Sequence, residues 1–301
     1  MLVVTGATGR LGRIVVERLL ERVPADRIAV VVRDRERAAG LAGRGVTVRI
    51  ADYNEPGTLA RAFAPGDRAL LISGNDLERN VAQHSAVVAA ARTAGVASLA
   101  YTGILSTAAG FALVDMHRAT EREIEASGLP YTFLRNGWYT ENYTVRLPQV
   151  LAEGVLVGNA GPGDRIATAT REDYALAAAV VMADLEQDPD GAGAAHLDRA
   201  YDLSGDTAWS FAEFAAEAGR QAGTPVRYEQ LTAAAYRDVL TGAGVPEPMA
   251  RLFTDTDDSI ARGELARTTG DLSRLTGRPT TPLAETVEQA VAAVRARAAA
   301  R

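Results

Sequence analysis

The sequence predicts an α/β protein built on a doubly wound parallel sheet, followed by a smaller helix-rich C-terminal lobe. Three observations predict this class: short apolar runs recur through the first half, helical patterns separate them, and the rhythm changes after about Asn136. Strands that are apolar along their whole length are typical of parallel sheets covered by helices on both faces. Right-handed crossovers between such strands give the Rossmann-type topology.

The first half alternates the two kinds of element at a regular pitch. Apolar, β-branched runs predict strands at Leu2–Thr5, Ile28–Val32, Val46–Ile50, Ala69–Ile72, Ser98–Thr102 and Tyr131–Leu134. Patterns with a helical period predict helices near Leu11–Glu21, Glu36–Ala42, Thr58–Phe63, Arg79–Ala94 and Val114–Ser127. We therefore place a first domain at residues 1–135.

The second half contains more helices, punctuated by glycine and proline. We expect a helix at Glu141–Glu153, a glycine-rich turn at Gly158–Gly163, a strand near Ile166–Ala169, a helix from about Arg171 to Leu185, a strand at Ala200–Leu203, and mostly helices beyond Trp209. These features predict a substrate-binding lobe at residues 136–301, which can return strands to the main sheet.

Bulk properties restrict the classes of protein that fit. The chain has 301 residues, 47% of them hydrophobic, and a formal net charge of −6, which disfavours broad contact with nucleic acid or anionic membranes. No apolar run reaches the roughly 18 residues that span a bilayer, and the start MLVVTGATG does not resemble a signal peptide. Cysteine is absent, which excludes disulfides and thiolate chemistry. We expect a cytoplasmic protein without nucleic-acid or membrane partners.

A glycine-rich turn follows the first strand. Gly6-Ala7-Thr8-Gly9-Arg10-Leu11-Gly12 has the spacing G-x-x-G-x-x-G between a strand and an amphipathic helix. The first glycine permits a tight turn, the second lets the backbone approach a diphosphate, and the third lets the helix pack closely on the strand. Because the helix N-terminus adds free N–H groups, the turn predicts a dinucleotide site.

Arginine at the end of the second strand predicts which dinucleotide binds. About 20 residues past the glycines, an acidic residue would bind the ribose 2′-hydroxyl of NAD, but this chain has Arg33, followed by Asp34, Arg35 and Arg37. A guanidinium suits the 2′-phosphate of NADP(H), and Arg10 in the turn can reach the same phosphate. The alternative is that these arginines form a solvated helix start, with Asp34 as its cap. We predict NADP(H).

The other strand ends should complete the cofactor site, because ligands of parallel sheets lie at the carboxyl ends of the strands. We expect Asp52 near the adenine, and Ser73 and Gly74 beneath the central ribose and the phosphates. The ends at Tyr101-Thr102 and at Asn136-Gly137-Trp138 are further candidates. Each of these could instead be an ordinary turn residue.

The absence of certain residue types and motifs from the sequence excludes several reactions. All 32 basic residues are arginine, so the Tyr-x-x-x-Lys pair of typical short-chain dehydrogenases cannot form, and Tyr101 is followed at the fourth position by Leu105. The three histidines form no H-E-x-x-H motif or close pair, so we predict no metal site. No serine stands in a G-x-S-x-G elbow. What remains is direct hydride transfer to an electron-poor acceptor, such as a quinone or a cationic dye, which needs little help from a protein acid.

Several segments resemble a known family. TGATGRLG at 5–12, ADYNEP at 51–56, LAYTGIL at 99–105, GLPYTFLRNGWYTENY at 128–143, VPEPMARLF at 245–253 and GRPTTPLAETV at 277–287 are similar to the NmrA-like atypical short-chain dehydrogenase/reductases. Within that family the likeness is to the bacterial NADPH:quinone oxidoreductases and, nearly as much, to the triphenylmethane reductases. It covers essentially the whole chain.

The resemblance implies a Rossmann domain, a small C-terminal lobe, and NADPH between them. It assigns the adenosine-phosphate half of the cofactor to Gly6, Thr8, Gly9, Arg10, Leu11 and Arg33. Around the nicotinamide and acceptor it places Asn136, Gly137, Trp138, Tyr139 and Asn142. His117 stands where lysine-bearing relatives that reduce phenylpropanoids have their catalytic lysine, so it could act as a weak acid, or it could only pack or contact ribose. Trp138, Tyr139 and Tyr143 could form an aromatic wall for a flat acceptor, or could pack in the core.

Three functions therefore stay open. The first is an NADPH-dependent reductase of a small aromatic acceptor, such as a quinone or dye, acting as a monomer or homodimer with catalytic candidates His117, Tyr139 and Asn142. The second is a regulator of the NmrA type that binds NADP(H) without turnover. The third is a pathway-specific reductase of a secondary metabolite.

Overall fold

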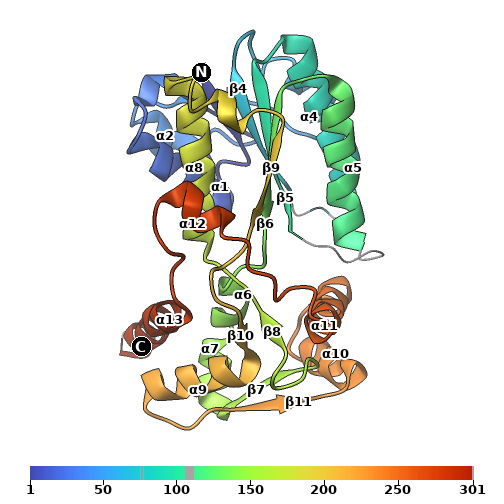
Figure 1. Cartoon of the computed structure of the whole chain (residues 1–301), viewed down its shortest axis with the longest axis vertical. Coiled ribbons are helices and arrows are strands. Elements are labelled where there is room, and N and C mark those ends of the chain that lie inside the picture. The colour runs from blue at the N-terminus through green and yellow to red at the C-terminus, as the bar shows by residue number, and fades with distance from the viewer. Residues whose placement is uncertain (75, 77, 106–111, 300–301) are drawn as a thin grey trace.

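The core of the protein is a seven-stranded, wholly parallel sheet (Figure 1). The structure is a computed structural model that describes all residues except 75, 77, 106–111 and 300–301. Its strand order is β3-β2-β1-β4-β5-β6-β9. The strands are β1 (Leu2–Thr5), β2 (Ile28–Val32), β3 (Thr47–Ile50), β4 (Arg68–Ile72), β5 (Ser98–Ile104), β6 (Tyr131–Asn136) and β9 (Arg199–Leu203). From β1 the chain adds β2 and β3 on one side and then β4, β5, β6 and β9 on the other. This change of direction at β1 is the doubly wound topology that the sequence predicts.

Helices cover both faces of this sheet. One face packs on α1 (Arg10–Leu20), α8 (Arg171–Gln187) and α12 (Asp271–Thr276) through a core that includes Val15, Leu19 and the alanine-rich side of α8. The other packs on α3 (Pro56–Leu59), α4 (Asn80–Ala94) and α5 (Ala112–Ser127), with Val87, Val88 and Ile124 buried against the sheet. Strands β1, β2 and β4 are almost wholly buried, which explains their continuous apolar sequences.

The chain crosses between the sheet and the smaller lobe more than once. It first leaves the sheet after Asn136, the last residue of β6, but α8, β9 and α12 come back to it. Strand β9 pairs in parallel with β6, with Thr132 opposite Arg199 and Asn136 opposite Leu203. The C-terminal half therefore contributes one strand and two helices to the Rossmann sheet.

The smaller lobe has its own apolar core, which includes Tyr143, Trp209, Phe211 and Phe214. It contains two short sheets, in which β10 pairs with β8 and β11 pairs in parallel with β7. Its elements are α6 (Glu141–Thr144), α7 (Leu147–Glu153), β7 (Val155–Gly158), β8 (Arg165–Ile166), β10 (Trp209–Ser210), α9 (Phe211–Ala222), β11 (Arg227–Gln230), α10 (Ala233–Gly242), α11 (Glu247–Ala261) and α13 (Leu283–Ala299).

Two expectations about this lobe need correction. The single helix expected at Glu141–Glu153 is broken into α6 and α7, because Pro148 occupies the first turn of α7 and cannot continue a preceding helix. The strand expected near Ile166–Ala169 is shorter and ends at Ile166, after which Ala169 makes only an isolated bridge to Tyr139.

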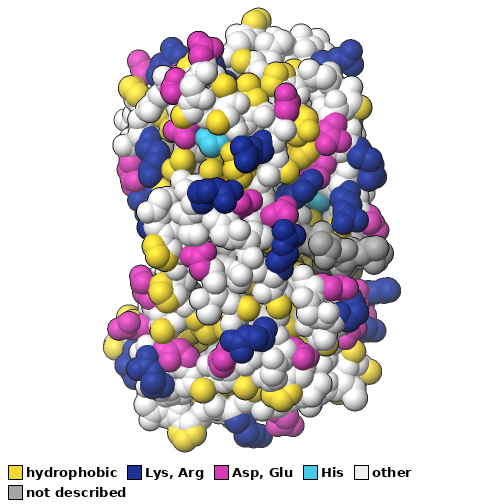
Figure 2. Space-filling model, in the orientation of Figure 1, with side chains coloured by type: hydrophobic (Ala, Val, Ile, Leu, Met, Phe, Trp, Pro, Cys, Tyr) yellow, Lys and Arg dark blue, Asp and Glu magenta, His cyan; other side chains and the backbone are white. Residues whose placement is uncertain are grey.

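Acidic and basic side chains are interspersed over both lobes on the face shown in Figure 2. In the described part of the chain, no helix combines the length and apolar character needed to cross a membrane. The same residues contain no group of three or more histidine, aspartate or glutamate side chains placed to hold a metal ion.

Candidate functional site

The glycine turn has the geometry of a diphosphate site. Gly6 has a φ of +61°, which other residues adopt only with strain, and the N–H of Gly9 donates to the carbonyl of Gly6 over 2.9 Å. A Cβ on Gly12 would lie 2.3 Å from the oxygen of Gly6, so only glycine lets α1 approach β1 this closely. Gly9 caps α1 without a side-chain hydrogen bond, which leaves the N–H groups of the first turn available to an anion.

The side chains of this turn divide into two groups. Thr8 is partly exposed and Arg10 is exposed, so both can contact a ligand directly. Leu11 is 8% exposed and packs in the core beneath α1. Its predicted contact with the cofactor could therefore come only from its backbone.

Unpaired arginines gather at the end of β2. Arg33, Arg35 and Arg37 are exposed, and in the described part of the chain no carboxylate lies within ion-pairing distance of them or of Arg10. Asp34 instead accepts a hydrogen bond from the backbone N–H of Glu36 over 2.9 Å, so its carboxylate is engaged locally in an Asx turn. Nearby guanidinium groups without partners suit a phosphate dianion.

The ends of β3 and β4 are joined by side chains of α4. Asp52 accepts from the backbone N–H of Asn54, and Asn54 in turn accepts from the side chain of Gln83 over 3.0 Å. The Asn80 amide donates to the Ser73 hydroxyl and to the Gly74 carbonyl over 3.2 and 3.0 Å. Asn80 is fully buried, and its Oδ1 has no hydrogen-bond partner. Sequence reasoning missed Asn80 and Gln83, although both lie on the first turn of the helix that follows β4.

Tyr101 and Thr102 lie on opposite faces of β5. The hydroxyl of Thr102 accepts from the backbone N–H of Ser73 over 3.1 Å, which ties it to the expected cofactor site. Tyr101 has no exposed surface, and its hydroxyl lies 2.6 Å from Nδ1 of His117 on α5. The structure thus directs the Tyr101 hydroxyl toward a catalytic candidate.

His117 is 8% exposed, and this burial changes its chemistry. Burial lowers the pKa of His117 to about 4, because the imidazolium would lose its solvation. The ring is therefore neutral near pH 7. The sequence suggested a weak acid titrating near neutrality, whereas the structure provides a neutral imidazole, which acts by donating or accepting a hydrogen bond.

The end of β6 carries the remaining candidates. Asn136 is 5% exposed and its Oδ1 has no hydrogen-bond partner, so a buried acceptor awaits a donor. A Cβ on Gly137 would lie 2.8 Å from the hydroxyl of Tyr174 and 3.0 Å from the carbonyl of Leu203, so the turn after β6 requires glycine.

Arg171, at the start of α8, links Tyr139 and Asn142. Its guanidinium lies 4.6 Å from the centroid of the Tyr139 ring and donates to Oδ1 of Asn142 over 3.1 Å. Tyr139 also contacts Tyr174 edge-on, and burial raises its pKa. Sequence reasoning missed Arg171, because no motif connects it with residues some 30 positions earlier.

A cavity of about 230 Å³ lies between the ends of β5 and β6 and the smaller lobe. Its walls are formed by Leu105, Gly137, Trp138, Ile166, Ala167, Gly263, Glu264, Leu265 and Arg267. Of the expected aromatic wall, only Trp138 lines it. Tyr143 is 5% exposed and packs against Trp209 and Phe211, while Tyr139 packs on the core beneath α1 and α8.

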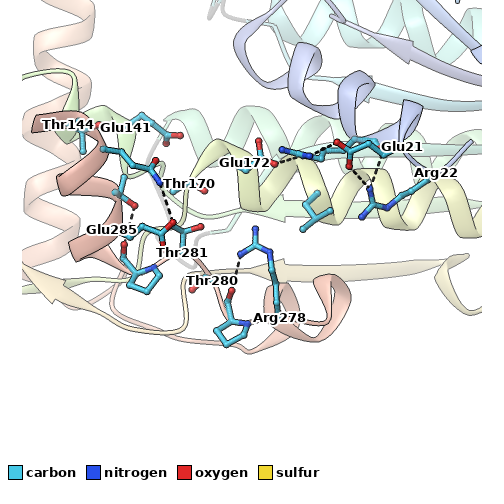
Figure 3. Close-up of a pocket in the computed structure, with 17 residues that line it drawn as sticks. Glu21, Arg22, Glu141, Thr144, Thr170, Glu172, Arg278, Thr280, Thr281 and Glu285 are labelled. Atoms are coloured by element: carbon cyan, nitrogen blue, oxygen red, sulfur yellow. Dashed lines mark hydrogen bonds and ion pairs between the residues drawn. The ribbon is translucent and has the colours of Figure 1, made fainter. Parts of the chain in front are cut away.

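A larger groove of about 850 Å³, lined mostly by charged and polar residue types, lies between α1, α8 and α13 (Figure 3). It shares no lining residue with the cavity beside Trp138. Its arginines have acidic partners: Arg18 pairs with Glu172, and Arg278 pairs with Asp173 over 2.7 Å. The groove contains none of the residues of the glycine turn or of the arginine group. The candidate functional site is therefore the carboxyl edge of the sheet.

The sheet order, the glycine turn and the buried polar groups at this edge define a dinucleotide-binding protein of the Rossmann class. The chain belongs to the NmrA-like family, whose sequence profile matches residues 1–278.

Two relatives are similar along the whole chain. Quinone oxidoreductase 2 of Escherichia coli is 41% identical over 288 residues, which cover 95% of this chain and 97% of that protein. The crystal structure of that NADPH-dependent quinone oxidoreductase complexed with NADPH has a TM-score of 0.88 and covers 96% of this chain and 99% of its own. The Citrobacter sp. triphenylmethane reductase complexed with NADP(H) is 40% identical, with a TM-score of 0.88, and covers 96% of this chain and 100% of its own.

A more distant relative has another named activity. The NAD(P)H azoreductase of Xenophilus azovorans is 28% identical over 292 residues, which cover 95% of this chain and 96% of that protein.

Proposed function

We propose that this protein is an NADPH-dependent reductase that transfers hydride directly to a quinone-like or other electron-poor aromatic acceptor. The observation that carries the proposal is the group of unpaired arginines beside a glycine turn and a helix N-terminus that has no side-chain cap. The complexes of the Escherichia coli relative with NADPH and of the Citrobacter relative with NADP(H) support the choice of cofactor.

The residues present fit that cofactor. The N–H groups of Arg10 and Leu11, at the start of α1, would bind the diphosphate, and Arg33 with Arg10 would bind the 2′-phosphate. Asp52, Ser73, Gly74 and Thr102 would line the adenine and ribose positions. The buried Oδ1 of Asn136 would accept a hydrogen bond from the nicotinamide carboxamide, which would satisfy an acceptor that otherwise has no partner.

The cavity beside Trp138 would hold the acceptor. Its walls are mostly apolar, with Glu264 and Arg267 as the charged exceptions, so it would exclude water from a flat ring. Tyr139 and Asn142, held by Arg171, would support the turn at Gly137 and Trp138, which borders the acceptor cavity.

Bound NADPH would supply the hydride. Because the chain has no lysine, no Tyr–Lys pair delivers a proton, so the residues work mainly by holding donor and acceptor in position. A neutral His117 can donate a hydrogen bond to an acceptor oxygen as negative charge develops on it, and the proton that completes the hydroquinone comes from solvent. The acceptor is thus a small molecule, and we keep the expectation of a monomer or homodimer.

Steady-state oxidation of NADPH tests the proposal. The purified full chain should oxidise NADPH only when a quinone or a cationic dye is added, and NADH should be a poorer donor. Tight, selective binding of one redox state of NADP(H) without acceptor-dependent turnover would instead favour the regulator. Unchanged NADPH fluorescence at saturating concentrations would contradict both functions.

A further inference from the structure

A chain of buried polar side chains joins β5 to α4 and α5 behind the candidate site. Its members are Tyr101 on β5, His84 on α4, and His117 and Thr120 on α5, all 8% exposed or less. The Tyr101 hydroxyl lies 2.6 Å from Nδ1 of His117, and Nδ1 of His84 lies 2.9 Å from the hydroxyl of Thr120. The role inferred for this chain rests on the proposed function, because it concerns the proton on His117 during reduction of a quinone.

The proton of Tyr101 has one good acceptor. Burial raises the pKa of Tyr101 above its usual value, so the side chain is a phenol with its O–H in place near neutral pH. The other histidine nitrogen within reach, Nδ1 of His84, lies 3.5 Å away, at the limit for a hydrogen bond. The O–H of Tyr101 therefore points to Nδ1 of His117.

His84 and Thr120 form the other end of this group of buried polar side chains. The Thr120 hydroxyl donates to the carbonyl of Met116 over 3.3 Å, which leaves its oxygen to accept from Nδ1–H of His84. Burial lowers the pKa of His84 to about 3, so this ring is neutral as well. With its one proton on Nδ1, donated to Thr120, its Nε2 carries none. With its only N–H turned to Thr120, His84 cannot take the proton of Tyr101.

We propose that Tyr101 is a positioning residue that fixes His117 as the tautomer protonated at Nε2. A neutral imidazole has one N–H, and a nitrogen that accepts from Tyr101 cannot carry it. Under the proposed function, Nε2 would then be the ring nitrogen with a proton to donate to the oxygen of a quinone. Without the Tyr101 hydroxyl, the ring could carry its proton on either nitrogen, and part of the population would lack the donor.

The effect of the His117 N–H on the rate of reduction depends on the kind of acceptor. Hydride transfer to a quinone leaves a hydroquinone anion, whose charged oxygen gains from the N–H of His117 before solvent protonates it. Hydride transfer to a cationic triphenylmethane dye joins the hydride to the central carbocation and gives a neutral product without a new proton. Loss of Tyr101's hydroxyl should therefore slow quinone reduction and leave reduction of the cationic dye unchanged.

Nitrogen-15 NMR of the histidine-labelled full chain tests the tautomer directly. The three histidines give few signals, and His117→Gln identifies those of His117. The wild-type spectrum should show His117 protonated at Nε2, and Y101F should shift it toward a mixture of tautomers. A wild-type His117 protonated at Nδ1, or a tautomer unaffected by Y101F, would overturn the proposal. The wild-type spectrum decides the first point even if Y101F does not fold.

Tyr201→Phe is the matched control. The hydroxyl of Tyr201 lies 2.7 Å from Nδ1 of His196, and both residues are buried on the Rossmann domain with no link to the candidate site. This variant loses the same kind of bond and should change only the signals of His196. In turnover, Y101F should lose roughly tenfold or more in kcat with a naphthoquinone, while Y201F should lose nothing.

If Y101F loses kcat equally with the quinone and with the cationic dye, the role of Tyr101 is structural only and the proposal fails. If the wild type oxidises no NADPH with any acceptor, the proposed function fails, and the NMR result still decides the tautomer.

Discussion

At the scale of single residues, Gly12 shows how a backbone contact fixes a side chain's identity. Its α-hydrogen faces the carbonyl of Gly6, and the space for a Cβ is already filled by backbone atoms at 2.3 to 2.9 Å. Backbone atoms cannot rotate away as a flexible side chain can, so any substitution moves α1 relative to β1. The same movement would displace the N–H groups that the cofactor needs.

We therefore expect Gly12→Ala to lower the free energy of unfolding by about 1–3 kcal/mol, as overpacking usually does, and to weaken NADPH binding. Chemical denaturation and fluorescence titration measure the two effects. Gly40→Ala is the control, because a Cβ on Gly40 would meet nothing within 4 Å and should be neutral or slightly stabilising. A G12A protein with wild-type stability and affinity would contradict the close contact.

Arg33 should decide between the two dinucleotides. Arg33→Asp should weaken NADPH binding by about 1.5–3 kcal/mol, the usual value of a hydrogen bond to a charged group, and should affect NADH much less. Arg92→Asp makes the same charge change at an exposed position far from the glycine turn and should leave the preference intact. Dissociation constants for both cofactors check this, and an equal loss for both would show that Arg33 does not read the 2′-phosphate.

Some residues of the candidate site could be predicted from the sequence and others could not. The glycine turn and Arg33 follow from local spacing, and the structure places them together at the carboxyl edge of the sheet. The burial of Tyr101 depends on the face of β5 from which its side chain projects. Which of the two faces that is becomes certain only when its packing partners on α4 and α5 are known. Arg171 and Asn80 act through contacts with distant residues, which no local pattern reports.

At the scale of elements, α8 is tied to the C-terminal segment through its first turn. Thr170 and Asp173 form a capping box, and the Asp173 carboxylate also accepts from the backbone and side chain of Thr281 and pairs with Arg278. Asp173 is 1% exposed, so it holds α8 and the segment before α13 together inside the protein.

Asp173→Ala should lower the free energy of unfolding by about 2–4 kcal/mol, because it leaves several buried donors without an acceptor. The second capping box, formed by Ser210 and Glu213 at α9, supplies the comparison. The Glu213 side chain is 51% exposed, so Glu213→Ala should cost only about 1 kcal/mol. Similar losses in denaturant titrations of the two variants would contradict the special role of Asp173.

The sequence predicted the elements of the sheet better than those of the smaller lobe. Strands β1 and β2 have the expected bounds, because an unbroken apolar run has few other places to be buried. Strand β11 reads Arg-Tyr-Glu-Gln, and this polar segment becomes a strand only by pairing with β7, some 70 residues earlier. Such non-local pairing leaves no trace in local periodicity.

At the scale of the whole molecule, the smaller lobe contains a buried carboxylate that makes stability depend on pH. Asp257 on α11 is 3% exposed and accepts from the backbone N–H of Asn159 over 2.8 Å. Burial raises the pKa of Asp257 to about 7, against the opposing effect of the backbone N–H groups and Arg146. Between about pH 4 and pH 7 the folded protein therefore binds a proton that the unfolded chain releases.

The contribution of Asp257 to stability should accordingly be present at low pH and fall as the pH rises to about 7, with a slope of up to about 1.4 kcal/mol per pH unit. Asp257→Asn should remove this slope and gain stability relative to the wild type at pH 8. Asp255→Asn, on the same helix with 44% of its side chain exposed, should leave the slope unchanged. Parallel curves of unfolding free energy against pH for D257N and the wild type would refute the raised pKa.

The return of β9 to the sheet has a consequence for any attempt to divide the chain. A fragment that stops at residue 135 would have the glycine turn and Arg33, yet it would expose the hydrogen-bonding edge of β6 and the apolar side of α1, which β9 and α8 cover in the intact protein. Open strand edges and bare apolar helices promote aggregation. During synthesis, too, the nucleotide-binding half has to wait until the ribosome has added the next 70 or so residues before its last strand can dock.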